Sequence, residues 1–186
     1  LKIMCRLRPI RGDFITEVLQ INDYNFISKA VSIICQYSYD SGKEKACIIT
    51  TAYGFYELGI KLVDSMDSND LKSIYYLNIA SVSKKTIAKA CLGKAQKLII
   101  YIKDLETKKQ LAMDLAYYYV MLGESRVAKK VFNSYFNSKS SNVGINYKAI
   151  VIYCKLGDFK QAYKIIENEN KPAFKAILLA EYANIL

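Results

Sequence analysis

The sequence predicts an all-α protein built from stacked antiparallel helical hairpins, and three observations support this fold class. Only two prolines and eight glycines occur among 186 residues, a composition that favours long helices over a turn-rich β protein. From about residue 24 onward, apolar residues recur at the three- and four-residue spacing of amphipathic helices. Toward the C-terminus this pattern repeats with a period of 34 residues, which is typical of stacked helical hairpins.

The chain divides into two regions by composition. Residues 1–23 form a basic N-terminal segment, with four cationic residues and no acidic one in its first twelve positions. Residues 24–186 form one helical repeat domain, whose first predicted helix covers residues 25–37. The next helix is expected over residues 46–58, ending at Gly59, with a short partner helix near residues 60–66.

The predicted hairpin in the middle of the chain is longer than the 34-residue period, and it has no glycine at its turn. It runs over about residues 69–108, with Ser83 at the turn position, so that Ala88 and Leu92 match the second-helix pattern. At the C-terminus, Pro172 fits the first turn of a last helix that reaches about Asn184.

The two clearest hairpins turn at Gly123 and Gly157, which are 34 residues apart. Helices are predicted over residues 111–122 and 124–135 around the first glycine. Around the second, they are predicted over residues 145–156 and 159–167. The same offset relates three further pairs of residues: Tyr119 and Tyr153, Ala128 and Ala162, and Phe132 and Ile166.

These positions resemble the tetratricopeptide repeat. In that family a small residue and a tyrosine in the first helix precede a Gly-Asp-Tyr-like turn, and an alanine follows it by five residues. The matching residues here are Leu115, Ala116, Tyr119, Gly123, Ala128 and Phe132, followed by Ala149, Tyr153, Gly157, Asp158, Phe159 and Ala162. The resemblance implies an α–α superhelix, a solenoid whose concave groove is lined by the first helices.

The resemblance also implies a partner-binding strip, because fixed positions of each first helix face the groove in that family. Transferred to this chain, the strip comprises Met113, Tyr117, Val120, Met121, Tyr147, Val151 and Lys155. Its apolar and aromatic character favours binding of a peptide or an amphipathic helix. Alternatively, these residues pack against the N-terminal segment, another hairpin or a second copy of the chain.

A second functional hypothesis starts from the net charge of +10. Residues 84–109 carry eight lysines against two acidic residues. A nucleic acid is therefore a possible though less favoured partner, bound by Lys84, Lys85, Lys89, Lys94 and Lys97, with Tyr75, Tyr76 and Tyr101 near enough to stack on bases.

Catalytic chemistry is not expected. The chain has no histidine, which excludes Ser-His and Cys-His nucleophile pairs, and it has no phosphate-binding glycine motif. The five cysteines are widely spaced and are expected to be free thiols, without a metal site. No apolar run is long enough to span a bilayer. We therefore expect a non-enzymatic cytoplasmic interaction scaffold that uses no cofactor and contacts no membrane.

Overall fold

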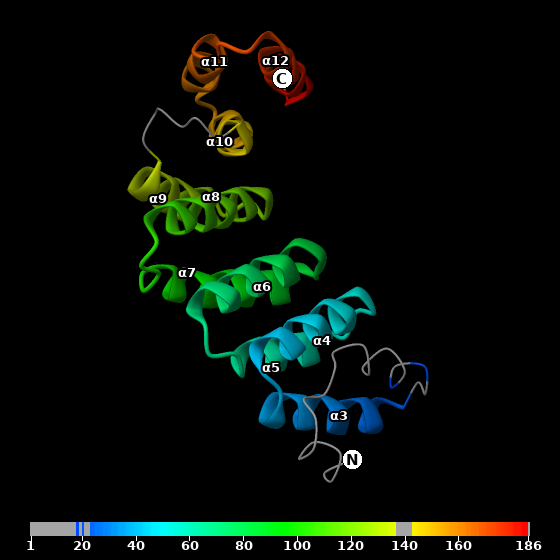
Figure 1. Cartoon of the computed structure of the whole chain (residues 1–186). Helices are drawn as coiled ribbons and strands as arrows, with labels where there is room; N and C mark the ends of the chain where they lie inside the picture. Colours follow the sequence, from blue (N-terminus) through cyan, green and yellow to red (C-terminus); the bar gives the residue numbers. More distant parts are fainter. Residues whose placement is uncertain (1–17, 19, 21–22, 137–142, 186) are drawn as a thin grey trace. The chain divides into compact units, whose positions relative to one another are not determined.

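The computed structural model describes residues 18, 20, 23–136 and 143–185, and over these residues the all-α class is confirmed. The described residues form ten helices and no strand (Figure 1). The helices are α3 (Tyr24–Tyr37), α4 (Asp40–Ala52), α5 (Tyr56–Asp64), α6 (Asn69–Val82), α7 (Lys85–Ile99), α8 (Leu105–Met121), α9 (Ser125–Tyr135), α10 (Val143–Lys155), α11 (Phe159–Glu167) and α12 (Pro172–Ile185). No helix in these ranges combines the length and the apolar composition that crossing a bilayer requires.

The chain consists of two compact units, Leu1–Ile102 and Lys103–Leu186. We call them the first unit, which contains α3 to α7, and the second unit, which contains α8 to α12. The range 24–186, which the sequence pattern treats as one domain, therefore contains the boundary between the two. The predicted basic segment 1–23 lies outside the described residues except for Val18, Gln20 and Asp23.

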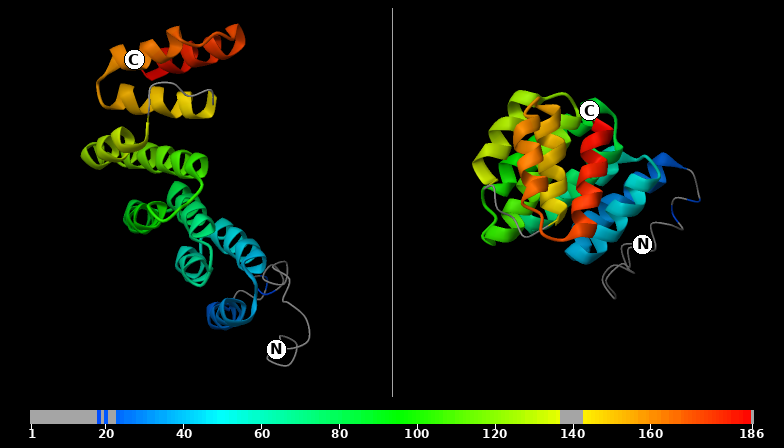
Figure 2. Two further views of the ribbon diagram at one scale, coloured as in Figure 1. Left: turned by 60° about the vertical axis from the view of Figure 1, so that its left-hand side comes forward. Right: turned by 90° about the horizontal axis from the view of Figure 1, so that it is seen from above.

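Helices that follow one another in sequence pack as antiparallel hairpins. The pairs are α4 with α5, α6 with α7, α8 with α9, and α10 with α11. In the second unit, α12 packs against both α10 and α11 (Figure 2). The hairpins predicted around Gly123 and Gly157 are thus confirmed, and so is a last helix that begins at Pro172.

Each of these two turns depends on a glycine with positive φ. Gly123 has a φ of 82° and Gly157 a φ of 78°. The residue after each glycine then donates its amide to the carbonyl of the tyrosine four residues before the glycine, Tyr119 or Tyr153, at 2.9 Å. This closure satisfies a helix C-terminus, and a side chain with a Cβ would strain the backbone there.

The first hairpin has the same turn, but at Gly54 and not at Gly59. Gly54 has a φ of 79°, and the following amide, that of Phe55, donates to the Thr50 carbonyl at 2.8 Å. The predicted helix 46–58 is therefore wrong: α4 ends at Ala52, and Gly59 lies buried inside α5. Apolar residues precede both glycines in the sequence, but only Gly54 has the left-handed conformation that ends a helix.

The hairpin of α6 and α7 turns without a glycine, as the sequence predicts. Ser83 follows the end of α6 in an extended conformation, with φ −93° and ψ 166°, and the next helix begins at Lys85. A left-handed residue is therefore unnecessary at this turn, and a serine can occupy it.

The four hairpins share one packing rule, counted from the turn residue. The fifth residue after the turn is small and buried, and the ninth is apolar and buried. These residues are Gly59, Ala88, Ala128 and Ala162 at the fifth position and Val63, Leu92, Phe132 and Ile166 at the ninth. The small residue lets the two helices approach closely, and the larger one removes apolar surface from water.

Candidate interaction surface

The strip predicted from the sequence lies in the second unit, and much of it is buried. Met113, Val120 and Val151 are 4–5% exposed. Tyr117 and Tyr147 are half-buried, whereas Met121 and Lys155 are exposed. The three buried side chains are core residues of the fold, which supports the packing interpretation for them and leaves a smaller accessible strip.

Polar contacts that join α8 to α10 and α10 to α12 also cross this strip. We call α4, α6, α8 and α10 first helices, because each is the first helix of its hairpin. Lys148 on α10 forms an ion pair with Asp114 on α8, and both side chains are largely buried. The hydroxyl of Tyr147 donates to Glu181 Oε1 on α12 at 3.2 Å. Each contact joins residues that are 34 positions apart, so it joins equivalent positions of neighbouring repeats. First helices in the second unit are therefore tied to one another directly.

The lysines of the alternative site lie on or next to α7. Lys84, at its N-cap, is exposed, as are Lys85, Lys89 and Lys97. Lys94 differs from them because its Nζ is 2.8 Å from both carboxylate oxygens of Asp64 and 5.2 Å from the centre of the Tyr76 ring. Lys94 thus links α7 to α5, and its charge is already neutralised by an acidic partner.

Two of the three tyrosines expected to stack on bases are not accessible. Tyr75 is 8% exposed and Tyr76 is 2% exposed. Their hydroxyls donate to Glu44, at 3.0 Å, and to Asp64. Burial and then the Glu44 hydrogen bond raise the pKa of Tyr75 to about 12. The base-stacking expectation is therefore wrong for these two rings, and it stands only for the exposed Tyr101.

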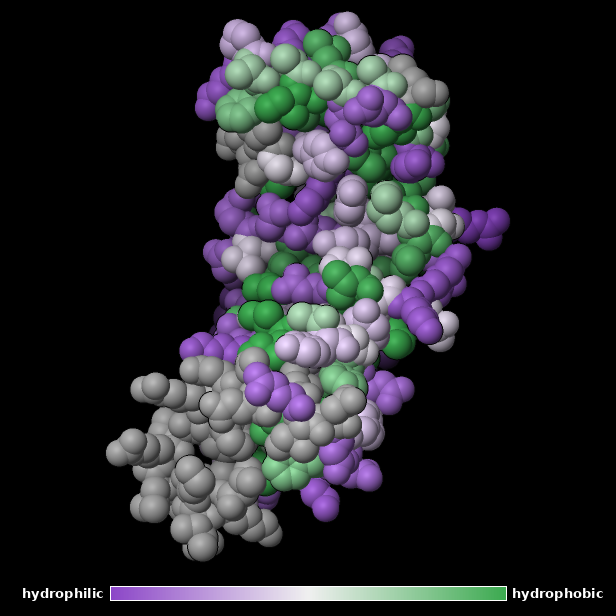
Figure 3. All heavy atoms as spheres, turned by 90° about the vertical axis from the view of Figure 1, so that its right-hand side faces the viewer, coloured by the Kyte–Doolittle hydropathy of each residue, from purple (hydrophilic) through white to green (hydrophobic). Residues whose placement is uncertain are grey.

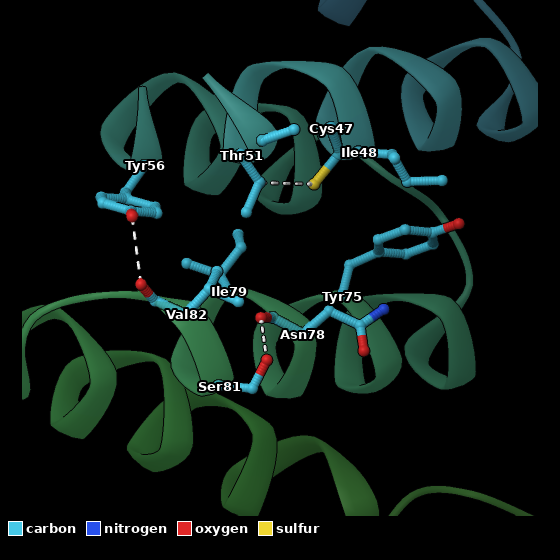
Figure 4. A pocket seen from close by; sticks show the side chains of 10 residues that line it. Cys47, Ile48, Thr51, Tyr56, Tyr75, Asn78, Ile79, Ser81 and Val82 are labelled. Atoms are coloured by element: carbon cyan, nitrogen blue, oxygen red, sulfur yellow. Dashed lines mark hydrogen bonds between the residues drawn. The ribbon is translucent and has the colours of Figure 1, made fainter. Parts of the chain in front are cut away.

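The first unit contains a hollow between the first helices α4 and α6, and the sequence pattern did not predict it. Its volume is about 410 Å³. Cys47, Ile48 and Thr51 on α4 face Tyr75 and Ile79 on α6 across it (Figure 4). The complete lining is Cys47, Ile48, Thr51, Ala52, Tyr56, Tyr75, Asn78, Ile79, Ser81 and Val82, and none of these residues is charged at neutral pH.

Small side chains at two positions explain why the hollow forms. The third and second residues before each turn are Thr51 and Ala52 in α4, Ala80 and Ser81 in α6, Val120 and Met121 in α8, and Cys154 and Lys155 in α10. The first unit has mostly smaller side chains at these positions than the second. Because protein interiors are close-packed, missing side-chain volume at adjacent positions leaves a gap.

Hydrogen bonds fix the rim of the hollow. The Tyr56 hydroxyl donates to the Val82 carbonyl at 3.0 Å, which joins α5 to the end of α6. The Ser81 hydroxyl donates to the Asn78 carbonyl at 2.7 Å. Two large apolar side chains of the lining are also exposed to solvent: Ile48 is 55% exposed and Val82 is 58% exposed. A hollow with a polar rim and apolar walls is suited to hold an apolar side chain.

The thiol in the hollow is not a nucleophile at neutral pH. Cys47 is 1% exposed, and burial raises its pKa to about 12. Only the thiolate reacts readily, so this side chain acts as a small apolar wall. Among the described residues, the cysteines Cys35, Cys47, Cys91 and Cys154 are free thiols, and no group of acidic or cysteine side chains could hold a metal. Cys5 lies outside the described residues.

One signal in the sequence could have located the hollow. With the first turn placed at Gly54, Ile48, Thr51 and Ala52 fall at the positions of Tyr117, Val120 and Met121. The predicted strip would then have continued into the first unit, with smaller side chains.

Comparisons with known proteins identify no relative: no protein-family model matches the chain, and neither the curated proteins nor the solved structures contain a match.

Proposed function

We propose that this chain is a non-enzymatic protein-interaction scaffold made of tetratricopeptide-repeat-like hairpins. It binds a peptide segment through an apolar side chain that enters the hollow between α4 and α6. The observation that supports this most directly is the hollow itself, about 410 Å³ in volume and lined only by uncharged side chains.

The position of the hollow supports the same function. It lies between successive first helices, the place where the resemblance to tetratricopeptide repeats puts a peptide groove. Exposed Ile48 and Val82 extend its apolar surface, and burying such surface provides about 25 cal/mol for each Å². Specificity then comes from the shape of the hollow and from the polar groups on its rim.

A random peptide library displayed on phage tests this proposal. We expect selected peptides to share one large apolar anchor. Ala52→Phe, which fills the hollow, should weaken their binding at least tenfold, because a central anchor typically contributes about 2 kcal/mol. Ala90→Phe is the matched control, because Ala90 is exposed on α7 and does not line the hollow.

Tyr117→Ala distinguishes the hollow from the strip predicted in the second unit. If the hollow is the site, Tyr117→Ala leaves peptide affinity unchanged. Loss of affinity in Tyr117→Ala, together with normal affinity in Ala52→Phe, would place the site in the second unit instead.

Nucleic-acid binding is the second candidate, supported by the exposure of three lysines. Lys84, Lys85 and Lys97 are exposed and have no ion-pair partner in the described part of the chain. If these lysines make three phosphate contacts, a plot of the logarithm of the association constant for single-stranded nucleic acid against the logarithm of the salt concentration should have a slope of about −2. Fluorescence anisotropy with a labelled oligonucleotide measures this slope. Lys85→Ala and Lys97→Ala should each reduce it by somewhat less than one.

A further inference from the structure

The two helices that follow the turns of the second unit, α9 and α11, repeat the same pattern of exposed cations. Counted from the turn glycine, the third and seventh residues are Arg126 and Lys130 in α9, and Lys160 and Lys164 in α11. Each cation of α9 is therefore 34 positions from its equivalent in α11. All four residues are exposed. Because residues four apart lie on one side of a helix, each helix presents its pair together.

Two aromatic rings are exposed beside the cations of α11. Phe159 is 40% exposed and Tyr163 is 45% exposed. At 100° per residue, these rings lie with Lys160 and Lys164 within an arc of about 140°. The Tyr163 ring also contacts the ring of Tyr182 on α12, with 6.0 Å between the ring centroids. One exposed side of α11 thus combines positive charge with aromatic surface.

The positive charge of these helices is not neutralised within the protein. Their cations are Arg126, Lys129, Lys130, Lys160 and Lys164, all exposed and without an ion-pair partner in the described part of the chain. α9 contains no acidic residue, and α11 contains only Glu167. Glu124 and Asp158 precede the two helices as N-caps. A cluster of unpaired cations attracts an anionic partner.

This arrangement is confined to one part of the molecule. In the first unit, the third and seventh residues after the turn are Glu57 and Lys61 in α5, and Thr86 and Ala90 in α7. Around the end of the second unit that contains α12, Figure 3 shows apolar side chains exposed. Seen from above in Figure 2, α9 and α11 lie on the same side of α10. The cations are therefore gathered on one side of the second unit.

We propose that this exposed side of α9 and α11, which we call the α9–α11 face, binds single-stranded nucleic acid. The cations contact phosphates, and bases stack on Phe159 and Tyr163. Sites for single strands combine a positively charged track for the backbone with aromatic rings, because every base has a face that can stack. Phosphate contacts and stacking do not read base edges, so many sequences should bind.

The exposed rings favour a nucleic acid over an acidic peptide. Carboxylates would pair with the cations equally well, but an acidic peptide would leave Phe159 and Tyr163 uncovered, whereas stacked bases cover them. The α9–α11 face shares no residue with the hollow or with the lysines of α7, both of which belong to the first unit. It is therefore a separate site, and it can be tested separately.

Fluorescence anisotropy with the full chain tests the proposal, using labelled oligouridylate and oligothymidylate of about twelve nucleotides. We expect saturable binding of one or both, and a preference for the RNA would indicate contact with 2′-hydroxyl groups. Lys164→Gln should weaken binding and reduce the salt slope by about 0.7, the share of one phosphate contact. Lys29→Gln, which removes an exposed lysine from α3, is the matched control and should change neither.

Tyr163→Ala separates stacking from charge. It should weaken binding roughly fivefold or more without changing the salt slope, because it removes a ring and no charge. Tyr163→Phe keeps the ring and should bind as the wild type does. Melting temperatures of the variants exclude loss of the fold as the cause.

Three results would overturn the proposal. One is wild-type affinity in Lys164→Gln or in Tyr163→Ala. Another is displacement of the oligonucleotide by polyglutamate as readily as by unlabelled oligonucleotide, which would identify an acidic peptide as the ligand. The third is loss of binding in Lys85→Ala with normal binding in Lys164→Gln, which would place the nucleic acid on α7. None of them bears on the hollow, which Ala52→Phe tests.

Discussion

The two units join their first helices in different ways, although both follow the same hairpin rule. Between α4 and α6, small side chains leave a hollow of about 410 Å³. Between α8, α10 and α12, an ion pair and a tyrosine–glutamate hydrogen bond tie the helices together, and Met113, Val120 and Val151 are buried. The difference lies in part at the residues two and three positions before each turn, which are mostly smaller in the first unit and leave a hollow there.

The same contrast extends to the hairpin cores. The first hairpin has Gly59 and Val63 at its fifth and ninth positions, whereas the third has Ala128 and Phe132. The Phe132 ring lies 4.7 Å from that of Phe136 and 4.9 Å from that of Tyr153, so it joins α9 to α10. The stability of the second unit should therefore depend more strongly on a single large aromatic side chain than the stability of the first unit does.

The largest expected effect is that of Phe132→Ala, which should lower the free energy of unfolding by about 3–5 kcal/mol through the cavity that it creates. Val63→Ala is the matched change in the first unit and removes only two methyl groups, at a cost of about 2 kcal/mol. Urea denaturation followed by circular dichroism measures both. An equal or larger loss in Val63→Ala would contradict the contrast between the cores.

Gly59→Leu should destabilise the first unit by about 1–3 kcal/mol, because even a Cβ at Gly59 would lie 2.9 Å from Thr51 Oγ1. Gly93, inside α7, has open space around its Cα, so Gly93→Ala should stabilise the chain by about 0.5–1 kcal/mol. The measurement is the shift of the urea midpoint. If Gly59→Leu is neutral, α4 and α5 do not pack closely at Gly59.

Much of the fold could be predicted from periodicity, because hairpin packing imposes it. A buried alanine five residues after a turn glycine appears twice, 34 residues apart, and both turns lie where the pattern indicates. The predicted turn of the first hairpin is wrong because its fifth residue is Gly59, and a glycine that follows apolar residues is typical of a helix end. Apolar spacing alone does not report φ, so it could not decide between Gly54 and Gly59.

The candidate site was less accessible to sequence reasoning. Position in a repeat identifies which residues face a neighbouring helix, but it does not say whether that neighbour fills the space. Val120 and Val151 are apolar residues that were predicted to line a groove, and they are buried by the fold itself. Tyr75 and Tyr76 lie near the lysines in sequence, but their hydroxyls bind carboxylates on other helices. Such pairings depend on tertiary contacts between distant residues.

The ion pairs of the two units should differ in strength. Lys148 and Asp114 have side chains 27% and 22% exposed, so Lys148→Met should leave a poorly solvated carboxylate and cost about 1–2 kcal/mol. Lys94 and Asp64 are 43% and 49% exposed, and Lys94→Met should cost about 0–1 kcal/mol. Thermal unfolding of both variants makes the comparison. A larger loss in Lys94→Met would show that the first unit, and not the second, is held by its ion pair.

The smallest expected effect is a difference in alkaline stability between two matched tyrosine–glutamate pairs. Tyr75 donates to Glu44 at 3.0 Å in the first unit, and Tyr147 donates to Glu181 at 3.2 Å in the second. Burial raises the pKa of both tyrosines, and it raises that of the more buried Tyr75 to about 12.

A tyrosine whose pKa is higher in the folded state than in the unfolded state stabilises the fold at pH values below its unfolded-state pKa of about 10. This stabilisation is lost as the pH rises through the folded-state pKa. The wild type should therefore lose about 1 kcal/mol through Tyr75 between pH 9 and pH 11. Tyr75→Phe removes this part of the pH dependence, because phenylalanine does not titrate. Tyr147→Phe should remove less, since its ring is only half-buried. Urea denaturation at the two pH values measures both differences. A larger change in Tyr147→Phe would contradict this comparison, because it would mean that folding raises the pKa of Tyr147 more than that of Tyr75.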